Sequence, residues 1–248
     1  MMKRLLITGA SRGIGAAMAE LAVQRGYRVM INYRENHQAA QTLVDRLTAL
    51  GGQAELWQAD VSDEQAVAKM FVHLDRCWGG LDALVNNAGM LEQQCRLDNI
   101  DGARLQRVFA CNVFGSFYCA REAVKRMSTR HGGSGGAIVN LSSIAASLGA
   151  PGEYVDYAAA KGAIDSFTRG LAKEVANEGV RVNGVRPGVI DTEIHACGGE
   201  PERVARVART VPMHRGGTAT EVAQAVLWLL SDEATYCTGS LLDVSGGR

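Results

Sequence analysis

Residues 5–15 read Leu5-Leu6-Ile7-Thr8-Gly9-Ala10-Ser11-Arg12-Gly13-Ile14-Gly15, and this stretch points to the fold class. A short apolar strand signal leads into a glycine loop, and apolar residues at helical spacing follow over 14–22. Glycines let the backbone come close to a bound group, and a helix N-terminus offers N–H groups and partial positive charge to a phosphate. A plain tight turn is the alternative, but three glycines in residues 8–15 favour nucleotide binding.

Strand and helix signals alternate along the rest of the chain. The predicted strands are 5–7, 27–33, 55–59, 82–85, 137–141, 180–185 and 241–244. The predicted helices cover 14–22, 39–50, 67–78, 105–124, 157–175 and 222–230, with a short one carrying Arg203, Arg206 and Arg209. This alternation predicts an α/β fold, a single Rossmann-like doubly wound sheet of seven mainly parallel strands flanked by helices. We expect one domain over residues 1–248, with 189–218 as a lid.

Composition excludes several classes of protein. Lys plus Arg and Asp plus Glu both number 26, so no basic excess indicates binding to nucleic acid or to a membrane surface. No apolar run is long enough to span a bilayer, and the first residues are too few for a secretory leader. The six cysteines form no C-x-x-C pair, which predicts reduced thiols in a cytoplasmic protein. Because cysteines and histidines lack ligand spacing, no metal site is expected.

Tyr157 and Lys161 are the main catalytic candidates. They lie four residues apart in a helical pattern and therefore share one face. A free phenol has a pKa of about 10, and an ammonium one turn away is expected to lower it, so that Tyr157 can exchange a proton with a substrate oxygen. Ser143, at the end of a predicted strand, is placed to hydrogen-bond the same oxygen. Taken alone, the Tyr-x-x-x-Lys spacing is a weak signal that fits an ordinary surface pair better than a catalytic pair.

The end of the second predicted strand bears on the choice of dinucleotide. A carboxylate there would bind ribose hydroxyls and repel a 2′-phosphate, whereas an arginine does the opposite. This chain has Asn32 and Arg34, with no carboxylate before Glu35. Together with Arg12, Arg34 offers guanidinium groups to a 2′-phosphate. The sequence therefore favours NADP(H), with NAD(H) as the alternative, unless Arg34 is a solvated loop residue.

Several polar residues fall where predicted strands end, at the edge where ligands bind in doubly wound sheets. They are the glycine loop, Asp60, Asn86, Ser143 and Pro187. Asn112 instead lies on the apolar face of a predicted helix. Its amide needs partners, which are either neighbouring backbone groups or a water molecule.

The order of these motifs resembles the short-chain dehydrogenase/reductase family over essentially the whole chain. The motifs are residues 8–15, Asn86-Asn87-Ala88-Gly89, Asn112, Ser143, Tyr157-x-x-x-Lys161 and Pro187-Gly188. The resemblance implies that Tyr157 is the acid/base, that Lys161 lowers its pKa and binds the nicotinamide ribose, that Ser143 orients the substrate oxygen and that Asn112 anchors a relay water. The implied cofactor-binding residues are Gly9, Ser11, Arg12, Gly13, Ile14, Gly15, Asn32, Arg34, Asp60, Val61, Asn87, Ala88, Gly89, Tyr157, Lys161, Pro187, Gly188, Ile190 and Thr192.

The resemblance also implies an NADP(H)-dependent oxidoreductase acting on a small ketone or secondary alcohol, assembled as a homotetramer or homodimer. The motifs are similar to those of 3-oxoacyl-carrier-protein reductases and of bacterial glucose or polyol dehydrogenases. In the first alternative Arg203, Arg206 and Arg209 would meet an acidic carrier protein, although a solvated helix face is the preferred interpretation of these arginines. A second alternative is a non-catalytic dinucleotide sensor or scaffold. The gap between Ser143 and Tyr157 is about a residue longer than in many members, so Ser142 is a rival to Ser143. Residues 196–201 also depart from the family pattern.

Overall fold

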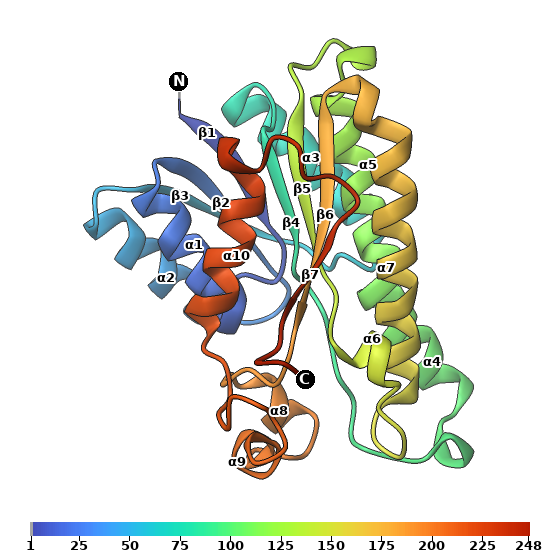
Figure 1. Ribbon diagram of the computed structural model, residues 1–248. Helices are drawn as coiled ribbons and strands as arrows, with labels where there is room; N and C mark the ends of the chain where they lie inside the picture. Colours follow the sequence, from blue (N-terminus) through green and yellow to red (C-terminus); the bar gives the residue numbers. More distant parts are fainter. Residues whose placement is uncertain (1) are drawn as a thin grey trace.

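The computed structural model describes residues 2–248, except the side chains of His195 and Cys197, so the prediction of a reduced thiol at Cys197 lies outside what is described. A seven-stranded sheet in the order β3-β2-β1-β4-β5-β6-β7 forms the centre of the molecule (Figure 1). The strands are β1 (Lys3–Ile7), β2 (Tyr27–Tyr33), β3 (Gln53–Gln58), β4 (Ala83–Asn86), β5 (Gly136–Leu141), β6 (Val180–Pro187) and β7 (Leu241–Val244). Every pairing is parallel, so the predicted Rossmann-like sheet is confirmed.

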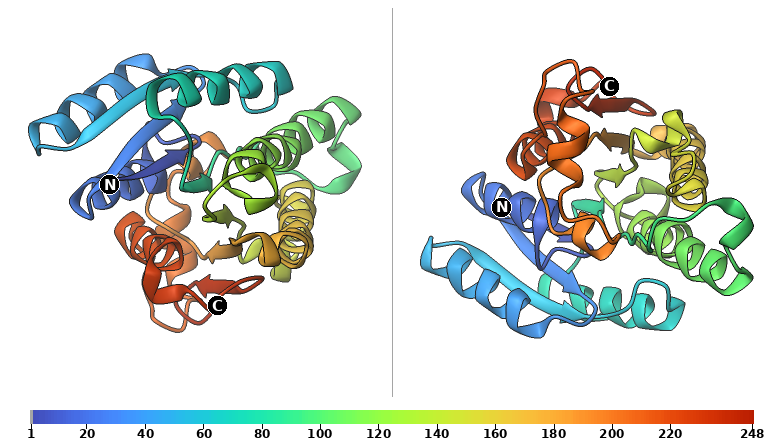
Figure 2. Two further views of the ribbon diagram at one scale, coloured as in Figure 1. Left: turned by 90° about the horizontal axis from the view of Figure 1, so that it is seen from above. Right: turned by 90° about the horizontal axis from the view of Figure 1, so that it is seen from below.

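Helices cover both faces of this sheet (Figures 1 and 2). One face carries α1 (Gly13–Gln24), α2 (His37–Ala49) and α10 (Ala219–Leu230), and the other carries α3 (Glu64–Trp78), α5 (Gly115–Met127) and α7 (Val155–Val175). The inner strands are buried on both faces, which explains their nearly continuous apolar sequences. Side chains from the two faces make two separate hydrophobic cores, one under each helical layer.

The helix predicted over 105–124 is interrupted in the structure. It consists of α4 (Gly102–Phe109), one π-helical turn, η2 (Ala110–Phe114), and α5. A π turn adds a residue without ending the helix, and such turns are frequent at functional sites. The apolar pattern continues through it, so the interruption left no signal in the sequence.

Three short helices lie near the carboxyl ends of the strands. α6 (Ala145–Leu148), α8 (Ile194–Cys197) and α9 (Arg203–Ala208) lie beyond the carboxyl ends of the strands, at the bottom of Figure 1. Single-turn 3₁₀ helices occur at Leu97–Asn99, Thr129–His131, Ala176–Glu178 and Asp232–Ala234. Residues 189–218 are tied down by a parallel bridge between Ile190 and Gly217 and by a small cluster of valines. Among the described residues no helix is both long and apolar enough to cross a membrane.

Candidate active site

Two adjoining hollows open at the carboxyl edge of the sheet. One is a cavity of about 180 Å³ between β5, α7 and the segment after β6. The other is a groove of about 530 Å³ along the glycine loop and the ends of β2 and β3. They share lining residues, including Asn87, Gly89 and Thr192, and so form one continuous site. All the residues predicted to contact a dinucleotide line one hollow or the other.

The glycine loop has the shape that a phosphate requires. Gly9 has a φ of +60°, and a Cβ there would lie 2.8 Å from the Cα of Ala88. A Cβ at Gly15 would lie 2.6 Å from the Cα of Ala10, so both positions need glycine. The N-terminus of α1 has no side-chain capping bond and no acidic residue in its first turn. This end of the helix therefore fits an anionic group of a dinucleotide.

Asn32 lies at the end of β2, where it was expected to contact the cofactor, but its side chain is hydrogen-bonded to backbone groups of the protein. Its side chain is buried, accepts a hydrogen bond from the N–H of Gly9 at 3.2 Å and donates one to the carbonyl of Ala59 at 3.0 Å. The amide is thus occupied in holding the glycine loop against the sheet. We interpret Asn32 as a residue that shapes the groove.

The two predicted phosphate-binding arginines lie on the groove. The Arg34 guanidinium is half-exposed and lies 2.8 Å from a carboxylate oxygen of Glu35 and 3.9 Å from one of Asp60. Arg12 pairs with Glu193 at 3.1 Å, which joins the glycine loop to the segment after β6. Exposed ion pairs of this kind contribute about 1 kcal/mol or less, so a phosphate can replace the carboxylates at little cost.

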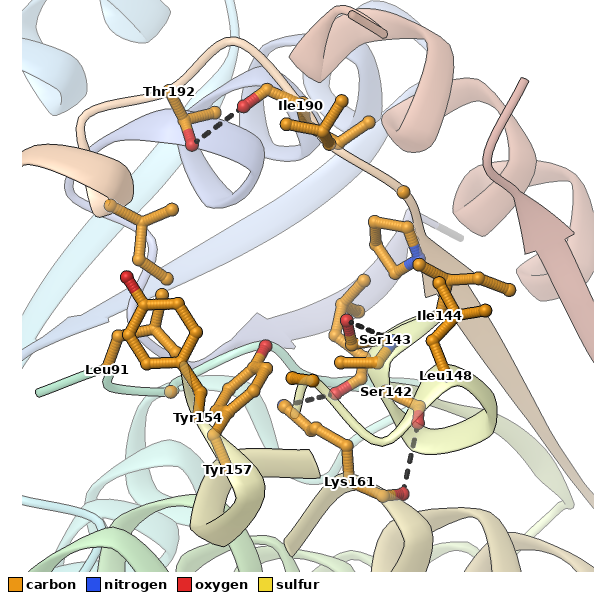
Figure 3. A pocket seen from close by; sticks show the side chains of 18 of the residues that line it. Leu91, Ser142, Ser143, Ile144, Leu148, Tyr154, Tyr157, Lys161, Ile190 and Thr192 are labelled. Atoms are coloured by element: carbon orange, nitrogen blue, oxygen red, sulfur yellow. Dashed lines mark hydrogen bonds between the residues drawn. The ribbon is translucent and has the colours of Figure 1, made fainter. Parts of the chain in front are cut away.

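Tyr157 lies in the first turn of α7, on the cavity wall (Figure 3). Burial raises its pKa to about 12, and a hydrogen bond with Ser143 lowers it by less. The prediction that Lys161 brings the phenol pKa below its ordinary value is therefore wrong for this structure. Desolvation by the surrounding protein disfavours a phenolate, and the ammonium lies 5.5 Å from the centroid of the ring.

Lys161 is buried one turn below Tyr157. Its ammonium donates a 2.7 Å hydrogen bond to the carbonyl of Leu141, at the end of β5. Burial lowers the pKa of Lys161 to about 8, although the nearby Cys111 and Asp165 act in the opposite direction. The group therefore keeps its proton at pH 7 while it is held close to the phenol.

The two serines after β5 have different surroundings. The Ser142 hydroxyl is buried and donates to the carbonyl of Lys161 at 3.1 Å, so it supports α7. Ser143 is half-buried and has Tyr157 as a hydrogen-bond partner, and its oxygen accepts from the N–H of Ala145 at 3.1 Å. This geometry favours Ser143 over Ser142 as the group that meets a substrate oxygen.

Asn112 lies in the π-helical turn and does not line either hollow. Its side-chain nitrogen donates to the carbonyls of Met90 and Val108, and its oxygen accepts from the N–H of Met90 at 3.1 Å. The sequence left two kinds of partner open for this amide, neighbouring backbone groups or a water molecule. In the structure the side chain hydrogen-bonds to backbone groups. Its part in a proton relay stays a prediction.

Sequence reasoning missed a cluster of charges beside the cavity. Arg203 donates to Glu153 at 2.6 Å and to Glu200 at 3.0 Å, and Arg206 contacts the same two carboxylates. The Arg203 side chain is only 12% exposed, so the solvated-face interpretation is wrong for this arginine. Arg203 also lies 5.2 Å from the ring of Tyr154, whose hydroxyl donates to the carbonyl of Gly198. These contacts fasten residues 198–206 to the loop before α7.

Comparison with known proteins extends this picture. Residues 9–248 match a family model described as enoyl-(acyl carrier protein) reductase. The chain is 58% identical to the uncharacterized oxidoreductase YgfF of Escherichia coli K12, over 98% of each chain. It is 38% identical to 3beta-hydroxysteroid dehydrogenase 1 of Eggerthella lenta, over 99% of this chain and 93% of that one. A short-chain dehydrogenase of Burkholderia cenocepacia, solved in complex with NADP, superposes with a TM-score of 0.90 at 33% identity, covering 99% of this chain and 97% of the other.

Proposed function

Because the chain belongs to the short-chain dehydrogenase/reductase family, we propose that it interconverts a small ketone and a secondary alcohol with NADP(H), which when bound supplies or accepts the hydride. The family membership makes the protein an enzyme acting on CH–OH groups with a nicotinamide dinucleotide. The choice of NADP(H), the substrate and the role of each residue are parts of the proposal.

The observation that carries the proposal is the arrangement of Tyr157, Ser143 and Lys161 on one wall of the cavity (Figure 3). A phenol with a pKa of about 12 is protonated at neutral pH, which suits a proton donor to a carbonyl oxygen. The Ser143 hydroxyl is placed to orient that oxygen. As the proton leaves, the Lys161 ammonium favours the phenolate that forms. These protonation states are the ones that carbonyl reduction requires of the two side chains.

Lining residues support a compact, largely apolar substrate. The cavity is lined by Leu91, Ile144, Leu148 and Ile194, and the ion-paired Arg203 and Glu153 form another part of its wall. The cavity of about 180 Å³ places Tyr157 and Ser143 together on its wall, so that both hydroxyl groups can hydrogen-bond one substrate oxygen. We propose that residues 189–218 act as the substrate lid within one domain.

The test is the variant Tyr157→Phe, which removes one oxygen and keeps the ring. We expect turnover of ketones to fall by ~100-fold to ~10,000-fold, the usual contribution of a positioned acid, while NADPH binding changes little. A panel of ketones, sugars and alcohols, followed by NADPH absorbance with NADH in parallel, identifies the substrate class. Tyr236→Phe, which makes the same change at a fully exposed tyrosine, is the matched control. Undiminished turnover in Tyr157→Phe would refute the role of the phenol.

Reduction of a 3-oxoacyl group on a carrier protein is the second candidate, because the description of the matching family model also names a substrate carried by an acyl carrier protein. The arginines that motivated it now argue against it. Arg203 and Arg206 are already neutralised by Glu153 and Glu200 of the same chain. Turnover of a free small ketone that is insensitive to salt would decide for the first candidate.

Assembly and location are also proposed. Phe114 and Phe117 are 49% and 44% exposed on the surface around α5, where Phe117 stacks on Phe167 of α7. Exposed aromatic residues that lie together are typical of contact surfaces, which supports a homotetramer or homodimer. Light scattering coupled to size-exclusion chromatography measures the state. A cytoplasmic location stays a prediction.

A further inference from the structure

A second group of chemically active side chains lies away from the two hollows. Glu55 on the edge strand β3 faces His73 and Cys77 on helix α3. One ligand atom from each lies within 4.8 Å of the others. None of the three lines the cavity or the groove, so they have no part in the proposed reaction.

The distances between these atoms suit one bound cation. The Nε2 of His73 lies 3.5 Å from the Sγ of Cys77 and 3.9 Å from the Oε2 of Glu55. Zn²⁺ bonds of ~2.0–2.3 Å at tetrahedral angles separate neighbouring ligand atoms by roughly 3.3–3.7 Å. The remaining distance, between Sγ of Cys77 and the carboxylate of Glu55, is at most 4.8 Å, so a side-chain movement of roughly 1 Å brings the three atoms onto one ion.

The surroundings already orient two of the ligands. Oε1 of Glu55 accepts hydrogen bonds from Arg28 and from the indole N–H of Trp78, which leaves Oε2 as the oxygen nearer the histidine. The His73 ring stacks on Trp57 with its centroid 4.1 Å away and an interplanar angle of 26°. Outer contacts that fix the orientation of ligands in this way are typical of metal sites.

From this geometry we infer that Glu55, His73 and Cys77 form a binding site for one Zn²⁺ ion, with the fourth position open to water. Thiolate, imidazole and carboxylate together suit zinc better than magnesium or calcium, which prefer oxygen ligands alone. The Glu55 and His73 side chains are about one-third exposed and Cys77 is exposed, so an ion can enter from solvent. The charges of a thiolate and a carboxylate exceed the single opposing charge of Arg28.

This inference departs from the expectation of no metal site. That expectation rested on the spacing of cysteines and histidines in the sequence. The two helical ligands are four residues apart, and the third comes from a strand that only the fold brings near. Because β3 is an edge strand paired with β2 alone, an ion here would join it to α3.

The experiment uses the full chain after treatment with a chelator that is then removed. Zn²⁺ is titrated against a chromophoric competitor, and Co²⁺ is added separately as a spectroscopic probe. We expect one Zn²⁺ per chain, a thiolate-to-cobalt charge-transfer band, and a rise in melting temperature with Zn²⁺. Cys77→Ser should abolish the band and weaken Zn²⁺ binding by ~10-fold or more, the least that the loss of an outer-shell partner costs. Cys237→Ser, which alters a partly buried thiol elsewhere, is the matched control and should change neither.

His73→Phe is a second variant that keeps an aromatic ring on Trp57 while removing both nitrogens. Circular dichroism establishes that each variant is folded. Loss of Zn²⁺ binding in both folded variants supports the site. Absence of Zn²⁺ binding by the unmodified protein, or wild-type affinity in either variant, overturns it. Enzymatic activity does not enter the readout, so the result is independent of the proposed reaction.

Discussion

Arg104 and Asp156 form a buried ion pair with two hydrogen bonds, and Asp156 is the residue directly before Tyr157. Nε of Arg104 lies 2.7 Å from Oδ2 of Asp156, and Nη2 lies 3.2 Å from Oδ1. The side chains are 9% and 1% exposed. Nη1 of Arg104 donates to the carbonyl of Gln93 at 2.6 Å. One guanidinium thus connects α4, the start of α7 and the loop after β4.

We expect Arg104→Met to destabilise the protein and to lower its kcat/KM. Removing one partner leaves a buried carboxylate without its counter-charge, which costs about 3–5 kcal/mol in the free energy of unfolding. The start of α7 should also shift, and a displacement of ~1 Å near the reacting groups can reduce kcat/KM by up to ~100-fold. Urea unfolding measures the first effect and steady-state kinetics measure the second.

The double variant Arg104→Met, Asp156→Leu separates these effects. An apolar pair of similar size often stabilises as well as a buried ion pair does. Stability should therefore recover, whereas kcat/KM should stay low because the bond to Gln93 is still missing. Full recovery of kcat/KM in the double variant would mean that the pair serves stability alone.

Lys161 should make stability depend on pH in the alkaline range. In the unfolded chain a lysine keeps its proton up to about pH 10.5, whereas the folded chain releases this one near pH 8. Between these values the unfolded state binds more protons, so the free energy of unfolding rises with pH, by up to about 3 kcal/mol from this group. Below pH 8 the full cost of the buried charge remains.

The variant Lys161→Met lacks this titration. We therefore expect the free energy of unfolding of the wild type, relative to that of the variant, to increase as the pH is raised from 7 to 10.5. Lys173→Met, on the exposed side of the same helix, is the control and should run parallel to the wild type. Parallel curves for Lys161→Met and the wild type would show that the Lys161 pKa is not lowered.

Much of this architecture could be predicted because buried parallel strands carry their own signal. Each predicted strand has a counterpart whose ends differ by at most two residues. The helices were found from apolar spacing, but the π-helical turn at 110–114 was not, since an inserted residue leaves the pattern almost unchanged. Long-range polar contacts were also invisible. Arg104 pairs with a residue 52 positions away and Arg203 with one 50 positions away.

In the candidate active site too, features set by local sequence were predicted, whereas features set by long-range packing were not. Spacing alone brought Tyr157 and Lys161 to one face of α7, because helix geometry is local. The direction of the Tyr157 pKa shift was predicted wrongly, because burial depends on the elements that pack around the residue. Asn112 was expected to be buried, and it is, but its partners Met90 and Val108 become known only from the folded structure.

Arg34 provides the test of cofactor preference. Replacing it with Ala should raise the KM for NADPH by about tenfold, the equivalent of roughly 1.4 kcal/mol, because a charge-assisted contact to the 2′-phosphate is lost. The KM for NADH should change little. Arg25→Ala, at an exposed position after α1, is the control. An equal rise for both dinucleotides would place Arg34 on a part of the cofactor that the two have in common.

The ion pairs of Arg203 and Arg206 with Glu153 and Glu200 can have one of two roles: they hold residues 198–206 against the cavity, or they form a surface that docks a partner. Arg203 is mostly buried and lines the cavity, whereas Arg206 is 53% exposed and does not line it. If the cluster fastens the lid, Arg203→Met should raise the substrate KM several-fold, leave the NADPH KM unchanged and cost about 1–3 kcal/mol of stability, because Glu153 and Glu200 each lose a charged partner. Arg206→Met should have a smaller effect on the substrate KM and on stability.

A surface that docks an acidic carrier would give the opposite order, because exposed charges meet a partner first and are screened by salt. Steady-state kinetics of both variants at low and high ionic strength, with urea unfolding, therefore separate the two roles.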